Sequence, residues 1–310
     1  MPELPEVETV RAGLANHVLD ALVTDVHIHD LRSLKRNFSG PDGFSKELTG
    51  KRLQGIVRRG KFLWFPISLD RAVVCHLGMS GQVLVRSKDF GQDKLTRITI
   101  GLEKPSGEEI EMRFVDQRLF GGMQIDDMVE TSDQKPAGYF PEGPSTAMIP
   151  TSVSHIARDL LDPEFDGSGV VSKMRGRNSG IKRVLLDQNL LSGIGNIYAD
   201  ESLWRARLHY DRPASAISVR RLNELISTAK DVLQEAVLRG GTSFDEQYKN
   251  VNGESGYFSQ DLNAYSRAGL PCARCATPIK RAAWANRSSF FCPKCQRKYS
   301  FSAQPREHRD

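Results

Sequence analysis

The sequence lacks three features that would mark a membrane protein, a secreted protein or a repeat protein. It contains no uninterrupted apolar run near the ~18 residues that a membrane-spanning helix needs. Its N-terminus is acidic and does not show the basic-then-apolar order of a secretory leader. No segment recurs along the chain as an internal repeat. We therefore expect an intracellular globular protein.

Net charge is also small, +5 at pH 7, but the positive charge is concentrated at one end of the chain. Residues 270–310 contain nine Lys and Arg against two acidic residues, so the remainder is slightly acidic. A localised basic segment indicates a polyanionic partner, although solvated disordered tails have the same composition. The 310 residues suffice for two domain cores, or for one large core with a small appendage.

Cysteines are few, but four of the five are regularly spaced. Cys272 and Cys275 form one Cys-x-x-Cys pair, Cys292 and Cys295 form another, and sixteen residues separate the pairs. In a reducing compartment this spacing predicts a tetrahedral Zn²⁺ site. Two disulfides are the alternative, which the missing secretory leader disfavours. Cys75 lies in an apolar run and is expected to be a buried thiol without a role.

The first eight residues, Met1 to Glu8, place a proline directly after the initiator methionine. Removal of Met1 would leave a secondary amine at Pro2, with the carboxylates of Glu3 and Glu6 close by. Such an amine can act as a nucleophile, because a terminal amine with a pKa of about 7.8 is neutral far more often than lysine at pH 7. Taken alone, these residues favour the simpler interpretation of a helix with Pro5 at its first position.

Hydrophobic spacing divides the chain into a β-rich part and a helical part. Apolar residues at helical spacing from Val7 to Val18 predict an N-terminal helix. Short β-rich runs from residue 22 to about 127 predict a β-sandwich or barrel-like domain, and a proline-rich stretch at 131–150 predicts the start of a linker. The expected strands are 23–28, 52–57, 62–67, 72–75, 82–85, 97–100 and 110–114, with a turn at Pro41-Asp42-Gly43; the expected later helices are 181–189, 197–207 and one capped by Ser218 that ends at Gly240. Phe290, Phe291 and Trp284 are expected to form a small core around the metal.

Three glycine-containing loops carry groups suited to nucleic acid. The loop from Ser192 to Asn196 precedes a helix, so its N–H groups can bind an anion. Two other loops, His76 to Gly81 and Asp116 to Gly122, present Met, Arg and Phe side chains that can wedge into a base stack. Each motif alone has an ordinary alternative, because Met usually fills cores and surface cations are usually solvated.

Taken together and in order, these stretches resemble the bacterial formamidopyrimidine-DNA glycosylase family. The resemblance covers nearly the whole chain and implies an α+β fold with an N-terminal β-sandwich domain, a helix-two-turn-helix domain and a C-terminal four-cysteine zinc finger. The matching stretches are Pro2 to Thr9, Lys61, His76 to Gly81, Asp116 to Gly121, Gly193 to Ala199 and the four cysteines. The implied ranges are 1–130 for the catalytic β-sandwich domain, 131–165 for the interdomain linker region, 166–268 for the helix-two-turn-helix DNA-binding domain with a lesion-capping loop, 269–300 for the finger and 301–310 for a disordered tail.

The resemblance implies the catalytic residues. Pro2, freed of Met1, attacks the sugar C1′ to form a Schiff base, Glu3 handles protons, and Glu6 lies near the nucleophile. Lys61 assists β-elimination and contacts phosphate. Arg287 is similar to the finger arginine credited with δ-elimination. The sequence does not decide whether the carboxylates accept protons from the amine or hold it in its charged form.

The resemblance also implies the DNA contacts. Met79, Arg118 and Phe120 look like the residues that fill the void left by a flipped base, with Arg118 facing the orphaned cytosine. Asn196 and Arg287 look like the phosphate grip. His76 and Arg177 lie at positions expected to contact DNA, and residues 241–257 resemble the loop that closes over the flipped base.

The implied function is base-excision repair. The protein would remove oxidised purines, 8-oxoguanine and formamidopyrimidines, from duplex DNA and then cleave the strand by β,δ-elimination. Leu4 favours this purine branch over the oxidised-pyrimidine branch of the endonuclease VIII type, and a non-catalytic zinc-finger DNA-binding protein is the other alternative. We expect one structural Zn²⁺, since four thiolates leave no open position for water. The expected partner is damaged double-stranded DNA, without a nucleotide cofactor or a membrane. We also expect a monomer in the bacterial cytoplasm.

Several positions depart from the family pattern. Leu95 stands where many relatives have a DNA-contacting His, which puts that contact in doubt. Arg177 stands where the family has a DNA-contacting lysine, Ser266 replaces the Gly of Tyr-Gly-Arg, and Ala276 replaces the Gly after the second cysteine. None of these differences touches the residues expected to carry the chemistry.

Overall fold

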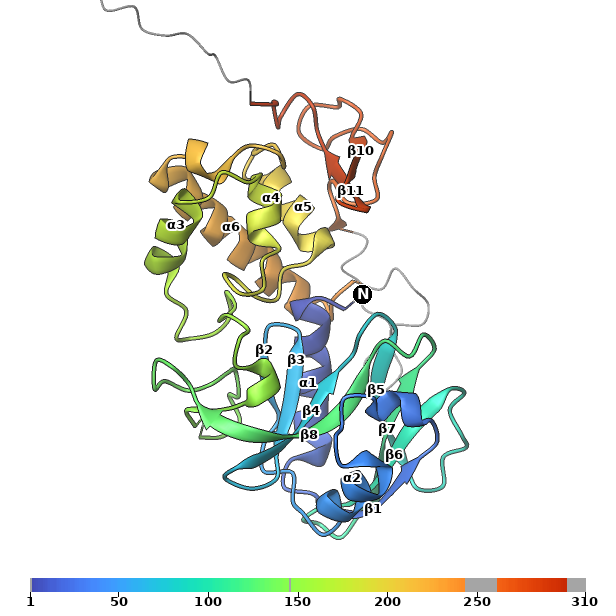
Figure 1. Ribbon diagram of the computed structural model, residues 1–310. Coiled ribbons are helices and arrows are strands. Elements are labelled where there is room, and N and C mark those ends of the chain that lie inside the picture. The colour runs from blue at the N-terminus through green and yellow to red at the C-terminus, as the bar shows by residue number, and fades with distance from the viewer. Residues whose placement is uncertain (1, 145, 243–260, 300–310) are drawn as a thin grey trace, which may run out of the picture.

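The computed structural model describes residues 2–144, 146–242 and 261–299. Figure 1 shows two lobes, one above the other, with the N-terminus at their junction. The lower lobe holds the strands β1 to β9, and the upper lobe holds the helices α3 to α6 with the cysteine-bearing hairpin of β10 and β11 beside them. This arrangement confirms the expected α+β fold of a sheet domain, a helical domain and a C-terminal four-cysteine module.

The lower lobe is a sandwich of two antiparallel sheets. Their strand orders are β1-β6-β7-β5 and β2-β3-β4-β8-β9. Side chains alternate across each strand, so one face of each sheet supplies the core, where Val83, Ile98 and Phe114 are fully buried. The strands are β1 (Leu22–Ile28), β2 (Val57–Arg59), β3 (Phe62–Pro66), β4 (Arg71–His76), β5 (Gly81–Ser87), β6 (Thr96–Glu103), β7 (Glu109–Asp116), β8 (Gly122–Glu130) and β9 (Met148–Pro150). β9 lies in the stretch expected to start the linker, and it pairs with β8.

Helix α1 (Leu4–Val18) joins the two lobes. Val7, Val10 and Leu14 pack into the core of the sandwich, whereas Leu4 belongs to the core of the helical domain. Pro5 lies in the first turn, where its missing N–H leaves no hydrogen bond unmade. The start of the chain is therefore held between the lobes by packing on both sides.

The helical domain is built around α6 (Val219–Leu238). The Ser218 side chain accepts a hydrogen bond from Arg221 N at 3.4 Å, which confirms the expected cap. Leu222, Ala229 and Leu233 lie at helical spacing and are fully buried. The other helices are α3 (Gly167–Arg175), α4 (Ile181–Leu185) and α5 (Asn196–Arg205), with the short 3₁₀ helices η1 (Leu31–Leu34), η2 (Thr151–Val153) and η3 (Ala214–Ala216).

The C-terminal hairpin consists of β10 (Lys280–Trp284) and β11 (Arg287–Phe291). Its two-residue turn has φ 43° at Ala285 and 59° at Asn286, as a tight turn between twisted strands requires. Arg287 follows this turn directly and pairs with Trp284.

The structure differs from the sequence predictions in several elements. Residues 40–48 form α2 (Gly40–Leu48), so the turn expected at Pro41-Asp42-Gly43 was wrong. A proline and a glycine suggest a turn locally, but Phe44 and Leu48 anchor the segment as a helix by complete burial. Residues 53–56 are not in a strand, and α4 ends at Leu185.

The predicted core around the metal was correct only for Phe290, which packs against the cysteine cluster. Phe291 instead contacts the ring of His209, with centroids 4.9 Å apart. The Trp284 ring lies 5.0 Å from the Lys182 ammonium. Both side chains therefore hold the hairpin against the helical domain.

Among the described residues, no helix combines the length and apolar character needed to cross a membrane.

Candidate active site

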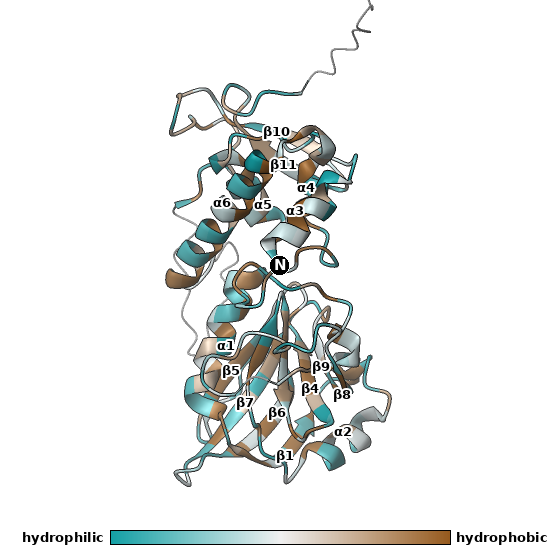
Figure 2. Ribbon diagram, turned by 90° about the vertical axis from the view of Figure 1, so that its left-hand side faces the viewer, coloured by the Kyte–Doolittle hydropathy of each residue, from teal (hydrophilic) through white to brown (hydrophobic). Residues whose placement is uncertain are grey.

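The first residues lie where the two lobes meet, as the N label shows in Figures 1 and 2. Pro2 is buried there, and Glu3 is only 3% exposed. Met1 lies outside the described residues. Pro2 and Glu3, the two residues expected to carry the chemistry, are therefore both buried where the lobes meet.

The Glu3 carboxylate reaches the N-terminal end of α5. Oε2 accepts hydrogen bonds from Gly195 N at 2.7 Å and Tyr198 N at 3.3 Å, and Oε1 accepts one from Ile197 N at 2.9 Å. The first turn of a helix has N–H groups without partners inside the helix, and here three such groups donate to the Glu3 side chain. The donors of the glycine-rich turn that the sequence offers to an anion are therefore occupied by a side chain of the protein.

The two glycines of this turn are required by the close approach of α1. A Cβ on Gly195 would lie 2.2 Å from Glu3 Cδ. Gly193 has φ 89°, and its Cβ would lie 2.6 Å from Leu4 Cδ1. The backbone bond from Leu4 N to Gly193 O, 3.0 Å long, fixes the two segments together.

Glu6 lies behind Glu3 and is surrounded by donors. Its Oε2 accepts from Glu3 N at 2.7 Å, and its Oε1 accepts from the Tyr198 hydroxyl at 2.5 Å, Thr242 N at 2.8 Å and Thr242 Oγ1 at 3.0 Å. Burial raises the pKa of Glu6, the charge of Glu3 raises it further, and the donors oppose the shift. Glu6 thus connects α1 to α5 and to Thr242. Thr242 belongs to the segment expected to cap the lesion, residues 241–257, of which residues 243–257 lie outside the described residues.

Lys61 extends from the β2–β3 turn to the same region, and its Nζ donates to Ile194 O at 3.0 Å. Burial lowers the pKa of the Lys61 ammonium, and the positive charge of Arg287 lowers it further, against the opposing effect of Glu3. The turn is held in place by Asp159, which accepts from Gly60 N at 2.8 Å and pairs with Arg58 at 2.6 Å.

A cleft of about 480 Å³ opens at Glu3. Its walls come from the sheet domain through Met79, from α5 through Asn196, and from the hairpin through Arg287. Asn196 Nδ2 donates to Ser288 O at 3.1 Å, so α5 and the hairpin are joined at the cleft. The structure therefore brings Glu3, Met79, Asn196 and Arg287 together from four distant parts of the chain.

Met79, Arg118 and Phe120 are all exposed at neighbouring loop tips of the sheet domain. The buried Asp116 holds both loops, since its Oδ1 accepts from Ser80 Oγ at 2.5 Å and Arg118 N at 3.1 Å, and its Oδ2 accepts from Gly121 N at 2.9 Å. Large side chains are thus presented on a rigid base, as insertion into a base stack requires.

His76 and Arg177 lie away from the lining of this cleft. His76 stacks near Phe62, with centroids 4.8 Å apart, and it lines a cavity of about 270 Å³ with Lys35 and Arg36. Burial lowers the pKa of His76 to about 4, and the nearby cations act in the same direction. Arg177 is exposed on the helical domain, where it pairs with Asp187 at 2.8 Å.

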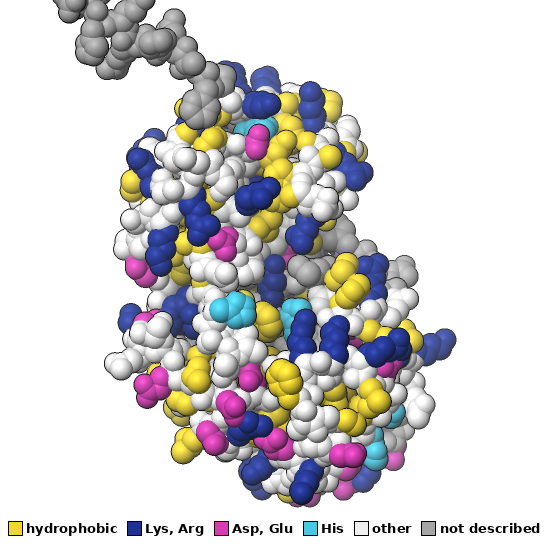
Figure 3. All heavy atoms as spheres, in the orientation of Figure 1, with side chains coloured by type: hydrophobic (Ala, Val, Ile, Leu, Met, Phe, Trp, Pro, Cys, Tyr) yellow, Lys and Arg dark blue, Asp and Glu magenta, His cyan; other side chains and the backbone are white. Residues whose placement is uncertain are grey.

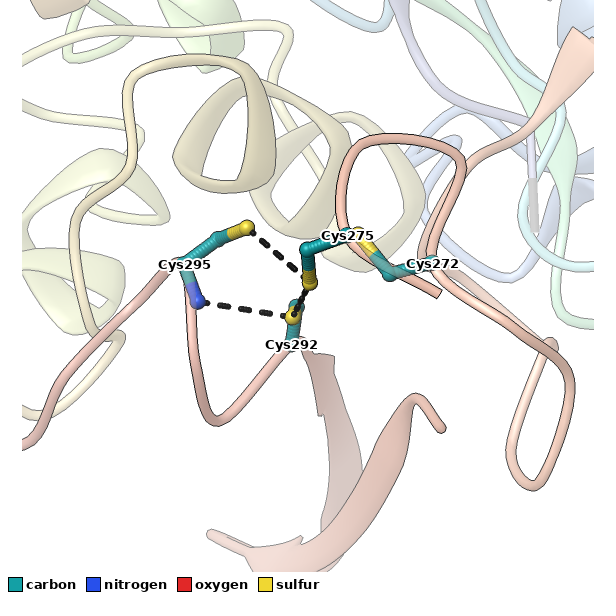
Figure 4. A group of neighbouring side chains, drawn as sticks. All are labelled: Cys272, Cys275, Cys292 and Cys295. Carbon is teal, nitrogen blue, oxygen red and sulfur yellow. Dashed lines mark hydrogen bonds between the residues drawn. The ribbon is translucent and has the colours of Figure 1, made fainter. Parts of the chain in front are cut away.

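The four paired cysteines form one cluster. Figure 4 shows Cys272, Cys275, Cys292 and Cys295 converging from two loops, with all four sulfur atoms within 4.8 Å of one another. The Cys275–Cys292 and Cys275–Cys295 sulfur distances are 3.4 and 3.5 Å. A Zn–S bond of about 2.3 Å in a tetrahedron implies S–S distances near 3.8 Å, so these thiols fit one structural Zn²⁺.

The fifth cysteine, Cys75, is fully buried in β4, and burial raises the pKa of its thiol to about 12. This agrees with the expectation of an unreactive core thiol.

Positive charge is distributed over both lobes. Figure 3 shows Lys and Arg side chains on the upper and lower lobes, with His side chains near the waist between them. Such a distribution suits a ligand that follows both lobes, as a polyanionic strand would.

Sequence reasoning missed several residues that organise the site. Tyr198 and Thr242 hold Glu6, Asp116 holds the two loops, and the fully buried Lys182 pairs with Asp200 at 2.7 Å beneath the hairpin. The Lys182 ammonium also donates to Ser289 Oγ at 2.8 Å, so this cation is used inside the protein and is not available to a phosphate. No spacing rule identifies these residues, since their partners are distant in sequence.

Comparison with known proteins finds matches for three parts of the chain. Family models for the formamidopyrimidine-DNA glycosylase N-terminal domain, the formamidopyrimidine-DNA glycosylase H2TH domain and the zinc finger found in FPG and IleRS match residues 1–123, 156–247 and 269–297.

Curated relatives from several bacteria carry the name formamidopyrimidine-DNA glycosylase. The chain is 54% identical over 299 residues to the one from Leifsonia xyli subsp. xyli, covering 96% of this chain and 100% of the relative. It is 48% identical over 298 residues to the one from Streptomyces coelicolor, covering 96% and 98%.

Solved structures of Lactococcus lactis Fpg share the fold. The complex with an abasic site containing DNA matches with a TM-score of 0.77 and 29% identity, and the complex with an N7-benzyl-Fapy-dG containing DNA matches with a TM-score of 0.78 and 29% identity. Each match covers 96% of this chain and 100% of the other chain. This chain therefore belongs to the formamidopyrimidine-DNA glycosylase family.

Proposed function

We propose that this protein is a bifunctional DNA glycosylase and abasic-site lyase, which removes oxidised purines such as 8-oxoguanine and formamidopyrimidines from duplex DNA. The observation that carries the proposal is the cleft at the junction of the lobes. There the buried Glu3 lies next to Pro2, with the walls supplied by the sheet domain, α5 and the hairpin. Relatives named for this activity and Lactococcus lactis Fpg bound to lesion-containing DNA support it.

Pro2 is the proposed nucleophile once Met1 is removed. Its nitrogen forms a bond to the sugar C1′ as the bond between C1′ and the base breaks, and the base leaves with that electron pair and takes up a proton. The resulting ammonium gives up its N–H proton to the proton carrier, and the restored nitrogen lone pair then opens the C1′–O4′ bond. O4′ takes up a proton, and an iminium (Schiff base) remains. Glu3, adjacent to the nucleophile, is the proposed proton carrier.

Glu6 is proposed to hold Glu3 rather than to react. Its carboxylate accepts hydrogen bonds from Glu3 N, from the Tyr198 hydroxyl and from Thr242 N, and these bonds fix it beside Glu3.

Strand cleavage follows from the Schiff base. Loss of a proton from C2′ expels the 3′-phosphate, and a second elimination expels the 5′-phosphate. Lys61 is proposed to assist the first step, because its Nζ lies at the junction of the lobes, where it donates to Ile194 O at 3.0 Å, and burial lowers the pKa of its ammonium. Arg287, exposed at the start of β11, is proposed to bind phosphate and assist the second step.

DNA is proposed to lie across the waist between the lobes. Asn196 and Arg287 grip the phosphates of the strand at the cleft, and His76 contacts the backbone beside Lys35 and Arg36. Met79, Arg118 and Phe120 fill the space of the extruded base, with Arg118 opposite the orphaned cytosine. Arg177 would contact DNA from the helical domain only after exchanging its Asp187 partner.

Borohydride trapping on a duplex with 8-oxoguanine opposite cytosine tests the proposal. A covalent adduct on Pro2 is expected, and intact-mass analysis of the N-terminus should show that Met1 is absent from the active protein. Binding without any adduct would instead identify a non-catalytic damage-binding protein. Faster excision of thymine glycol than of 8-oxoguanine would assign the protein to the endonuclease VIII type of specificity.

We further propose that the protein acts as a monomer, without a nucleotide cofactor, in the bacterial cytoplasm. A reducing compartment keeps the four zinc-binding cysteines as thiols. The functional ranges are proposed as 1–130, 131–165, 166–268 and 269–300, with a disordered tail at 301–310, which lies outside the described residues. Size-exclusion chromatography with light scattering tests the monomer.

A further inference from the structure

The C-terminal end of α5 is built into the zinc centre through Trp204. This side chain is 7% exposed and packs in one cluster with Ala264, Ile279 and the cysteines Cys272 and Cys292. Its indole Nε1 lies 3.4 Å from Cys272 Sγ, within hydrogen-bonding distance for a sulfur acceptor. The indole N–H can only donate, so a buried tryptophan needs an acceptor, and here that acceptor is a metal-ligand sulfur.

Arg274, between the two cysteines of the first pair, holds the indole from its face. Its guanidinium carbon lies 3.8 Å from the centre of the Trp204 ring. The same guanidinium donates to the carbonyl oxygen of Arg205 at 3.2 Å and also to that of Trp204. These carbonyls end α5, where a cation is favoured by the negative end of the helix dipole. The ring is thereby fixed with its N–H directed at the sulfur.

A second anchor joins the other cysteine pair to the same region. Gln296 Nε2 donates to Leu208 O at 2.9 Å, and Gln296 Oε1 accepts from Cys292 N at 2.9 Å. Both knuckles of the finger are therefore hydrogen-bonded to the end of α5 or to the turn that follows it. The opposite end of α5 holds the Glu3 carboxylate, about 15 Å away for a helix of ten residues.

We propose that Trp204 is a positioning residue of the zinc centre, which stabilises the Cys272 thiolate through its indole N–H and thereby locks the finger onto α5. Four thiolates around one Zn²⁺ would carry excess negative charge, and the indole N–H directed at Cys272 Sγ would offset part of it and hold the sulfur in place. Groups that hydrogen-bond to metal ligands typically change metal affinity by about 10- to 100-fold. The inference goes beyond the proposed glycosylase activity, because it concerns the retention of zinc and the seating of Arg287.

The substitution Trp204→Phe tests it, with Trp284→Phe as the matched control. Phenylalanine keeps an aromatic ring in the cluster but has no N–H, and Trp284 contacts Lys182 rather than a cysteine. Zinc transfer to a chelator should be about 10-fold faster for Trp204→Phe and unchanged for the control. In Co²⁺-substituted protein, the sulfur-to-metal charge-transfer band should move to lower energy only in Trp204→Phe, because the sulfur electrons are no longer stabilised by the N–H.

A measurement on the wild-type chain keeps the test decisive if Trp204→Phe folds poorly. In protein loaded with ¹¹³Cd²⁺, we expect a scalar coupling between the metal and the indole N–H proton of Trp204. This coupling should be absent from Trp204→Phe and retained in Trp284→Phe. Absence of this coupling in wild type, or a zinc-transfer rate and a Co²⁺ spectrum that Trp204→Phe leaves unchanged, would overturn the proposal. None of these readouts depends on catalysis, so they are independent of the outcome of borohydride trapping.

Discussion

The substitution Gly195→Ala should slow the reaction strongly without unfolding the protein. Gly195 has φ −122° and ψ −161°, an extended conformation that alanine adopts without strain. The new Cβ, however, would lie 2.2 Å from Glu3 Cδ and 2.3 Å from Glu3 Oε1. Because ordinary contact begins near 3.4 Å, the carboxylate has to move by about 1 Å.

The expected loss follows from the hydrogen bonds that this movement breaks. The shortest of the three amide bonds to Glu3 comes from Gly195 itself, at 2.7 Å. A hydrogen bond to a charged group contributes about 1.5–3 kcal/mol. At about 1.4 kcal/mol per tenfold in rate, losing one such bond slows Schiff-base formation by roughly 10- to 150-fold. Loss of the bonds from Ile197 and Tyr198 would increase the effect.

Single-turnover borohydride trapping measures this rate directly, and zinc content with circular dichroism reports whether the fold is intact. Gly91→Ala is the matched control, since a Cβ there meets no atom within 4 Å and Gly91 has no positive φ. If Gly195→Ala formed the adduct within about twofold of the Gly91→Ala rate, the held position of Glu3 would be irrelevant to the chemistry, and the reasoning would be wrong.

Three further outcomes are expected. Cys292→Ser should lose bound zinc and weaken DNA binding, with a shallower salt dependence of the affinity; an unchanged salt slope would show that the finger does not contact phosphate. Asp116→Asn should lower the free energy of unfolding by about 1–3 kcal/mol. It should also reduce discrimination between cytosine and adenine opposite the lesion, because the backbone N–H of Arg118 loses its carboxylate acceptor. Excision assays on duplexes with cytosine and with adenine opposite the lesion check this. Burial lowers the pKa of His76 to about 4 from its ordinary 6.5, so as the pH falls below 6.5 the ring takes up a proton in the unfolded chain before it does so in the folded protein. The free energy of unfolding should therefore be unaffected by His76 above pH 6.5 and should fall by on the order of 3 kcal/mol between pH 6.5 and pH 4. Urea unfolding of His76→Gln should show a flatter pH dependence, and the same pH dependence as wild type would refute the assignment.

Local sequence signals predicted the elements whose stability is local. The apolar stripe of α1, the Ser218 cap of α6 and the strands β1 and β3 to β7 follow from periodicity and capping, whereas β8 and β9 were not predicted. Helix α2 did not, because Pro41 and Gly43 are turn formers and only the burial of Phe44 and Leu48 decides for the helix. Where a local preference and tertiary packing disagree, packing prevails.

The site shows the same division. Spacing alone identified the four cysteines, because zinc needs sulfur ligands from tight turns and these recur at short fixed intervals. The resemblance of ordered motifs identified Pro2, Glu3 and Lys61 as the residues to examine. Only the structure shows which groups surround them. Tyr198 and Thr242, which donate to Glu6, lie 192 and 236 positions from it along the chain.

The sequence by itself determined which groups are available: Pro2, Glu3 and Glu6 near the N-terminus, glycines before α5, and four paired cysteines near the C-terminal end. Tertiary structure decided what they bind. The N–H groups of the α5 turn could hold a phosphate or a carboxylate, and the packing of Leu4 against Gly193 delivers the Glu3 carboxylate to them. Sequence specifies donors and acceptors, whereas their pairing depends on distances set by the packing of two separate cores around α1.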